Sequence, residues 1–224
     1  MDHENNIKAI PTAEQYEVLV AKLLSLWDEM LLFRIKTELN PAGKTGTVLD
    51  VGMGTGIVLR YMANDHEFDG FHFVGIDYFE DMVATAKARV ANEGLADRID
   101  CAVGDANQLD FPDNSFDLVI SRATLHHLSD PTGALKEKYR VLKPGGFAII
   151  HDARRDAPAE TLAHFTKIRK DLGMGPTNIE EKFTMAEMES FVERAGLSSV
   201  SHLDTSASGP ESIGFELMIF KPKG

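Results

Sequence analysis

Residues 48–56, Val-Leu-Asp-Val-Gly-Met-Gly-Thr-Gly, constrain this chain more than any other segment. The apolar run Thr47 to Val51 predicts a buried strand, and the residues from Ile57 onward predict a helix. Between them stand three glycines at every second position, Gly52, Gly54 and Gly56. Such a turn lets a ligand approach bare backbone amides at the start of a helix, so we expect a ligand site there.

Asp50, two residues before the first glycine, indicates what kind of ligand fits. A carboxylate at this position repels a pyrophosphate and attracts a positively charged amino group. The dinucleotide fingerprint Gly-x-Gly-x-x-Gly/Ala also fails, because its third position falls on Ile57. The loop therefore favours a ligand with a cationic amino group over a dinucleotide.

Strand-like and helix-like segments alternate five times between residues 46 and 152. The later strands are predicted at Phe71–Ile76, Ile99–Val103, Phe116–Ser121 and Phe147–Ile150, the last after a turn at Leu142–Gly146 that closes a helix. Such alternation predicts a parallel sheet with helices on both faces.

Polar residues follow these strands at their carboxyl ends, which is where α/β sheets bind ligands. They are Asp50, Asp77, Asp105, Ser121 and His151, and we expect all of them along one edge of the sheet. Asp77 follows Gly56 by 21 residues, a spacing suited to hydrogen bonds with ribose hydroxyls.

The order Asp-x-Gly-x-Gly-x-Gly, then Asp77, Gly104-Asp105-Ala106 and Leu142-Lys143-Pro144-Gly145-Gly146, resembles the class I S-adenosylmethionine-dependent methyltransferases, type 11. The resemblance covers roughly residues 45 to 152. It implies a doubly wound, Rossmann-like α/β sheet of seven strands, mostly parallel with one antiparallel strand, and S-adenosylmethionine as cofactor. It implies these cofactor-binding residues: Asp50, Gly52, Gly54, Gly56, Asp77, Tyr78, Met82, Asp105, Ala106 and Ser121. In the family, the residue matching Asp105 binds the adenine amino group, and the next backbone amide binds a ring nitrogen.

The whole chain, residues 1–224, is predicted to be one methyltransferase domain with 46–152 as its cofactor-binding core. Residues 1–45 are predicted to be mainly one helix, with an apolar stripe at helical spacing formed by Leu19, Leu23, Leu26 and Met30. We interpret this stripe as core packing; the alternative, implied by the resemblance, is that the helix covers the cofactor, with Tyr16 over the methionine end. Residues 153–182 are expected to shape the acceptor pocket. Residues 183–224 are expected to hold a helix capped by Thr184 and Glu187, then the last two strands.

His126, His127 and His151 are the candidate catalytic residues, because they lie just after the fourth strand and at the end of the fifth, where His151 forms a candidate pair with Asp152. A base is needed only if the nucleophile must lose a proton. We interpret the histidines as positioning groups in preference to general bases, and Arg154 or Arg155 as candidate partners of an acceptor carboxylate.

Composition limits the partners. The formal net charge is −12 and no Lys/Arg cluster is present, so a small-molecule acceptor is expected in preference to nucleic acid. The single cysteine, Cys101, and the lack of any apolar run of membrane-spanning length indicate a cytoplasmic protein, and no metal site is predicted. A methyltransferase acting on protein or RNA and a non-transferring S-adenosylmethionine-binding protein are the alternatives. The acceptor atom and the oligomeric state stay open.

Overall fold

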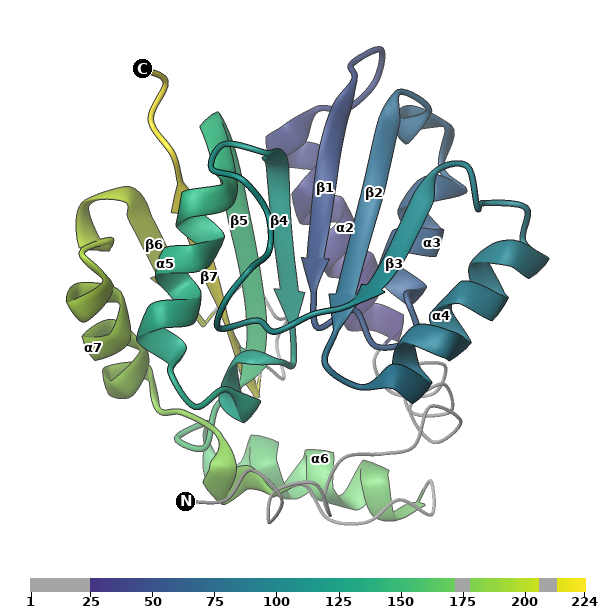
Figure 1. The fold of residues 1–224 in the computed structure, drawn as a ribbon. Helices are drawn as coiled ribbons and strands as arrows, with labels where there is room; N and C mark the ends of the chain where they lie inside the picture. Colours follow the sequence, from purple (N-terminus) through teal and green to yellow (C-terminus); the bar gives the residue numbers. More distant parts are fainter. Residues whose placement is uncertain (1–24, 172–177, 206–212) are drawn as a thin grey trace.

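A seven-stranded sheet forms the centre of the computed structural model, which describes residues 25–171, 178–205 and 213–224 (Figure 1). The strands are β1 (Gly46–Val51), β2 (Phe71–Asp77), β3 (Ile99–Val103), β4 (Phe116–Arg122), β5 (Leu142–Ala153), β6 (Ser201–Asp204) and β7 (Gly214–Phe220). Their order is β3-β2-β1-β4-β5-β7-β6, and β7 runs antiparallel to both its neighbours while the other pairs are parallel. The predicted fold class is confirmed.

Helices cover both faces of the sheet and one of its edges. They are α2 (Ser25–Leu39), α3 (Ile57–Ala63), α4 (Glu80–Asn92), α5 (Pro131–Val141), α6 (Ala159–Asp171) and α7 (Met185–Ala195). Helices α2, α3 and α4 pack on one face, and α5 and α7 pack on the other. Helix α6 lies across the edge where β1, β2 and β4 end (Figure 1). The carboxyl ends of these strands therefore face α6, and not the helices that cover the two faces of the sheet.

The period of two along each strand divides the core between the faces. In β1, Val48 packs in the cluster beneath α2 and α3, whereas the next residue, Leu49, packs in the cluster beneath α5 and α7. Strands buried on both sides in this way read as continuous apolar runs, which is the pattern that the sequence shows. A polar residue at the end of such a strand is thereby placed on a known face.

The bounds predicted for the fifth strand were wrong. The sequence placed a turn at Leu142–Gly146, but β5 already begins at Leu142, which pairs with Phe116. A bulge follows before Phe147 pairs with Leu118, and Gly145 adopts a φ of +83° within it. The glycine pair therefore serves an irregularity inside the strand and does not end a connection before it.

The helix after residue 183 forms as predicted. Thr184 Oγ1 accepts a hydrogen bond from the Glu187 amide at 3.1 Å, and the Glu187 carboxylate accepts one from the Thr184 amide at 2.7 Å. Gly196 ends α7 with a left-handed φ of +74°. The capping box fixes where α7 begins, directly after Lys182 and Phe183.

The N-terminal prediction is only partly within reach of the described residues. The first 24 residues, with Tyr16, lie outside them. In α2 the buried face is formed by Asp28, Leu31 and Ile35, whereas Met30 of the predicted apolar stripe lies at its margin. A buried aspartate at the centre of this face was not anticipated.

Candidate active site at the carboxyl edge of the sheet

The glycine loop turns tightly between β1 and α3. The Gly52 and Met53 amides both donate to the Ile76 carbonyl, at 2.9 and 3.0 Å. Gly52 has a φ of +79°, and a Cβ added there would lie 2.1 Å from Thr124 Oγ1. A side chain at this position would therefore displace the chain that follows β4. The glycine is required by the close approach of these two segments.

Asp77, at the end of β2, holds the loop from the other side. Its Oδ2 accepts a hydrogen bond from the Gly54 amide at 2.9 Å, and its Oδ1 accepts one from the Phe79 amide at 3.0 Å. Burial raises the pKa of this carboxyl, while the amide hydrogen bonds oppose the shift. Each carboxylate oxygen has a second lone pair, so Asp77 can accept further hydrogen bonds from a ligand's hydroxyl groups.

The other predicted cofactor residues surround this loop. Tyr78 is 65% exposed beside Asp77, and Met82 is buried one turn into α4. After β3, Asp105 Oδ1 accepts hydrogen bonds from the backbone amide and the side-chain Nδ2 of Asn107, at 2.8 and 2.9 Å. Ala106 is buried next to it. An exposed tyrosine ring and a turn with a surface carboxylate thus border the glycine loop on its β2–β3 side.

Ser121 is placed differently from the others. Its hydroxyl donates to the Val51 carbonyl at 3.0 Å and the residue is buried between β1 and β4. This hydrogen bond joins the strands on the two sides of the switch in strand order. The structure therefore gives Ser121 a role in holding the glycine loop, and a direct cofactor contact stays a prediction.

Buried charged groups cross four neighbouring strands on the face covered by α2. They are Asp50 (β1), Arg122 (β4), His151 (β5) and Glu216 (β7). Helix α2 adds two partners: Asp28 forms an ion pair with Arg122, and Arg34 Nε donates to Glu216 Oε1 at 3.2 Å. Period-two alternation explains the row, because each member stands two positions from a core residue on the same face: Val48, Ile120, Ile149 and, in the antiparallel β7, Met218.

The row carries more acid than base near the glycine loop. Burial raises the pKa of Asp50 to about 7, against the attraction of Arg122 and with added repulsion from Asp77 and Asp28. Burial raises the pKa of Asp28 to about 6, again against Arg122. A ligand amino group beside Asp50 would complete the charge balance that Arg122 provides only in part.

His151 and Asp152 face opposite sides of β5, although the sequence paired them. His151 Nε2 lies 2.9 Å from Glu216 Oε2, in the buried row. Asp152 instead meets His126: the His126 Nδ1 lies 2.7 and 2.8 Å from the two Asp152 oxygens, and the His126 amide donates to Oδ2 at 3.1 Å. The structure therefore brings His126 and His127 together with Asp152, and separates His151 from them.

His127 stacks on His126 at the rim of the site. The two ring centroids are 3.8 Å apart, and the His127 residue is exposed while the His126 side chain is only 3% exposed. Burial among surrounding atoms, then the charges of His126 and Lys182, lower the pKa of His127 below its ordinary value. His127 is therefore the member of the pair that solvent reaches.

Arg154 and Arg155 are both engaged by carboxylates. Arg154 lies 3.2 Å from Asp156, and Arg155 lies 2.7 Å from Glu187. Their predicted role as partners of an acceptor carboxylate finds no support in this geometry and stays a prediction.

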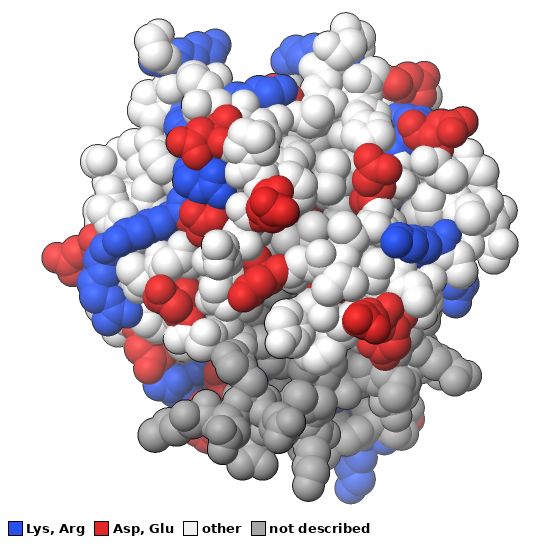
Figure 2. Space-filling view, viewed as in Figure 1, with Lys and Arg blue, Asp and Glu red and all other residues white. Residues whose placement is uncertain are grey.

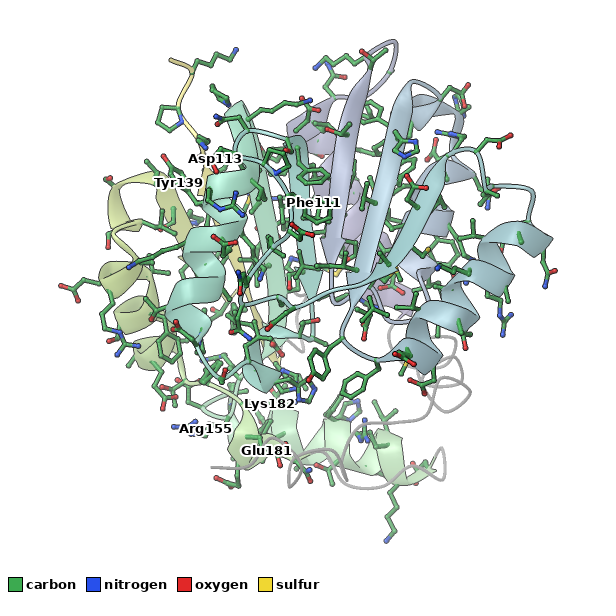
Figure 3. The ribbon with its side chains drawn as sticks, viewed as in Figure 1. Phe111, Asp113, Tyr139, Arg155, Glu181 and Lys182 are labelled. Atoms are coloured by element: carbon green, nitrogen blue, oxygen red, sulfur yellow. The ribbon has the colours of Figure 1, made fainter. Side chains whose placement is uncertain are left out.

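Sequence reasoning missed three residues of the site: Asp28, Arg122 and Lys182. Lys182 Nζ contacts His126 Nε2, and it comes from the chain just before α7 (Figure 3). An aspartate within an apolar helical stripe and an arginine ending a buried strand are signals that sequence reading can use. Lys182 carries no such signal, because its partner lies 56 residues away in the sequence.

The residues present fit a ligand with a sugar, an amino group and an adenine-like ring. The loop amides approach closely, Asp77 has spare acceptor capacity and Asp50 has a negative environment. Thr55 Oγ1, inside the loop, is buried without a hydrogen-bond partner among the described residues. Fold and site together define a Rossmann-like domain built for a nucleoside ligand that carries positive charge.

Comparisons with known proteins agree with this class. Residues 49–150 match the family described as methyltransferase domain. The chain is 38% identical over 138 residues to phosphoethanolamine N-methyltransferase 1 of Arabidopsis thaliana, covering 62% of this chain and 26% of that protein. It is 34% identical over 138 residues to a ubiquinone/menaquinone biosynthesis C-methyltransferase of Hydrogenovibrio crunogenus, covering 62% of this chain and 54% of that protein.

A solved structure, a SAM dependent methyltransferase from Aquifex aeolicus, aligns with a TM-score of 0.67 at 24% identity, covering 91% of this chain and 96% of that one. This likeness supports the fold. Residues 49–150 match the methyltransferase-domain family, and the likeness to the solved structure shows the Rossmann-like fold over most of the chain. The chain spans about a quarter to about half the length of the curated relatives named here.

Proposed function

We propose that this chain transfers the methyl group of S-adenosylmethionine to a small-molecule acceptor through an oxygen, nitrogen, sulfur or carbon nucleophile. The observation that carries the proposal is the glycine loop held between Asp77 and Thr124, with Asp50 directly before it. The cofactor supplies a methyl group on a sulfonium, which is already an activated leaving group. The chain then has to hold the nucleophile in line with the methyl group, and orientation of this kind supplies up to ~7–11 kcal/mol.

In this proposal each residue along the carboxyl edge of the sheet contacts a different part of the cofactor. Asp50 faces the cofactor's amino group, Asp77 its ribose hydroxyls, and Asp105 with the Ala106 amide its adenine. The acceptor lies on the far side of the glycine loop, near His126 and His127. Helix α2 and the described part of the acceptor-shaping segment, residues 153–171 and 178–182, border the site.

A small acceptor is favoured over a nucleic acid by charge. Acidic and basic side chains are interspersed on the face in Figure 2, and the chain's formal net charge is −12. Phosphate binding draws on a continuous basic surface, which this face does not offer.

Membrane-spanning helices and metal-ligand groups are absent from the described residues. Their helices include none long and apolar enough to cross a membrane, and their His, Cys, Asp and Glu side chains form no group of three or more suited to a metal ion.

The test is a metabolite screen for release of S-adenosylhomocysteine. It should include phosphoethanolamine and quinone precursors, because relatives are named for phosphoethanolamine and for quinone biosynthesis. Release that depends on one small molecule supports the proposal. Release only with protein or RNA would move the chain to macromolecular methylation. Cofactor binding without release on any acceptor would make it a non-transferring binding protein.

A further inference from the structure

A chain of three side chains ends at the acceptor side of the site. Asp152 and His126 are 1% and 3% exposed, and both Asp152 oxygens lie within hydrogen-bond distance of His126 Nδ1. Because a carboxylate accepts hydrogen bonds, Nδ1 carries a proton, and Nε2 is the nitrogen that exchanges one. The next group along is the Lys182 amine, which contacts Nε2.

Lys182 reaches this place from the segment between α6 and α7. In Figure 3 it lies between the lower edge of the sheet and α6, with Arg155 and Glu181 near it. Its backbone carbonyl accepts a hydrogen bond from Arg155, which in turn pairs with Glu187 of the α7 capping box. The Lys182 backbone is therefore held by contacts that lead through Arg155 to α7, while its amine is held by the contact with His126.

We propose that Lys182 is the base that takes the proton from the acceptor's nucleophile, and that Asp152 and His126 are positioning residues that hold its amine at the acceptor side of the site. This inference rests on the proposed function and names the acceptor class as a protic nucleophile. One proton is shared between His126 Nε2 and Lys182 Nζ. Asp152 holds His126 through Nδ1, so that Nε2 faces the Lys182 amine, and burial of that amine favours its uncharged form with a lone pair.

The charged groups around Lys182 act in both directions. Burial lowers the pKa of Lys182; Asp152 of β5 and Glu181 oppose this, and Arg169 of α6 adds to it. His126 and His127, from the chain after β4, also face the amine. Burial alone would raise the pKa of Asp152, but attraction to His126 and Lys182 keeps it below its usual value. Asp152 thus stays ionised and keeps its hydrogen bond with His126 Nδ1. A buried lysine of this kind is a known form of general base.

The step balances without a further reagent. The nucleophile's lone pair forms a bond to the methyl carbon, and the bond between sulfur and that carbon breaks with its electron pair remaining on sulfur. The proton of the nucleophile goes to the Lys182 lone pair, so the positive charge that the sulfonium loses is carried by the Lys182 ammonium, near the Asp152 carboxylate. Afterwards solvent takes the proton through the exposed His127 side.

Competitive acetylation with acetic anhydride across pH measures the proposal without any acceptor. The full chain, with and without S-adenosylhomocysteine, is labelled and the modification of each lysine is read by mass spectrometry. Lys167 of α6, whose side chain is 72% exposed, is the internal reference. We expect the midpoint of Lys182 below that of Lys167, because burial lowers the pKa of Lys182. In His126→Ala, the unscreened Asp152 charge should move the Lys182 midpoint upward. A wild-type midpoint equal to or above that of Lys167 overturns the proposal.

Activity on the acceptor found by the screen separates a base from a cation that binds the acceptor. Lys182→Ala and Lys182→Arg should both lose about 10²–10⁴-fold in single-turnover rate, because arginine keeps the charge but cannot accept a proton. Methylamine should partly restore Lys182→Ala, and Lys136→Ala, at an exposed position of α5, should match the wild type. Full activity in Lys182→Arg would contradict the proposal. Titration with S-adenosylhomocysteine tests the proposed function separately. If the protein binds S-adenosylhomocysteine but the acetylation midpoint of Lys182 is not below that of Lys167, only the assignment of Lys182 as the base is wrong.

Discussion

The aspartates of this site have different roles, although they are the same type of residue in the sequence. Asp77 accepts hydrogen bonds from two backbone amides, and it thereby joins the loop after β1 to the turn before α4. Asp152 accepts hydrogen bonds from the ring nitrogen Nδ1 and the backbone amide of His126. Asp50 and Asp28 instead share Arg122, and burial raises both their pKa values. Each role follows from the face of the strand or helix on which the residue stands.

Replacement of Asp77 tests ribose recognition at the residue scale. We expect Asp77→Ala to weaken S-adenosylhomocysteine binding by about 10- to 150-fold, since losing a hydrogen bond to a charged group costs roughly 1.5–3 kcal/mol. Isothermal titration calorimetry measures it. The matched control is Asp100→Asn on the neighbouring strand, an exposed carboxylate that pairs with His72 and should leave the affinity unchanged. Unaltered affinity in a folded Asp77→Ala protein would remove Asp77 from the cofactor site.

Asp50 has a pH dependence whose sign follows from its raised pKa of about 7. Between the unfolded value near 3.8 and pH 7, the folded chain keeps a proton that the unfolded chain has released. This group therefore lowers the stability of the ligand-free protein as pH rises through that window. Asp50→Asn should gain stability relative to the wild type from pH 5 to pH 8 in urea unfolding. Asp97→Asn, at an exposed position, should show no such trend. A difference that is flat with pH would contradict a buried, protonated Asp50.

At the scale of elements, α2 and α5 carry ionisable groups on faces that pack against the sheet. In α2, Asp28 and Arg34 pair with Arg122 and Glu216, so polar contacts lie beside apolar ones and fix the helix over the carboxyl edge. In α5, Lys138 is fully buried with no hydrogen-bond partner for its Nζ among the described residues. A buried ammonium without a partner costs stability, because its charged form loses water.

Replacing Lys138 should therefore stabilise the protein. Burial lowers the pKa of Lys138 to about 8 from an ordinary 10.5. Between these values the unfolded chain binds the extra proton, so the wild type should become more stable as pH rises from 8 to 10. Lys138→Met, of similar length, should raise the free energy of unfolding at pH 7 and remove that part of the pH dependence. Lys136→Met, on the exposed side of α5, is the control. A loss of stability in Lys138→Met would mean that the amine has a partner in solution.

At the scale of the whole molecule, the sequence predicted what depends on local pattern. Alternating elements, the glycine loop and Asp77 could be read because their spacing lies within one strand–helix unit. The contacts that complete the site could not be read. Arg122 meets Asp28 across 94 positions and His126 meets Lys182 across 56, and both contacts depend on how α2 and the segment before α7 dock on the finished sheet. His151 and Asp152 were paired because they are neighbours, whereas the pleat of β5 sends them to opposite faces.

Ligand selectivity is a property of the assembled edge and can be measured on the whole chain. A ligand present at 100 times its dissociation constant stabilises the folded state by about 2.7 kcal/mol. For a chain of this size each kcal/mol raises the melting temperature by about 2–4 °C, so S-adenosylhomocysteine should raise it by about 5–10 °C. NAD at the same concentration should produce little change, because its pyrophosphate would meet the Asp50 carboxylate. Adenosine, which lacks both the pyrophosphate and the amino-acid end, is the control and should give an intermediate or small shift. A larger shift with NAD than with S-adenosylhomocysteine would refute the assignment of Asp50 to an amino group and, with it, the interpretation of the loop.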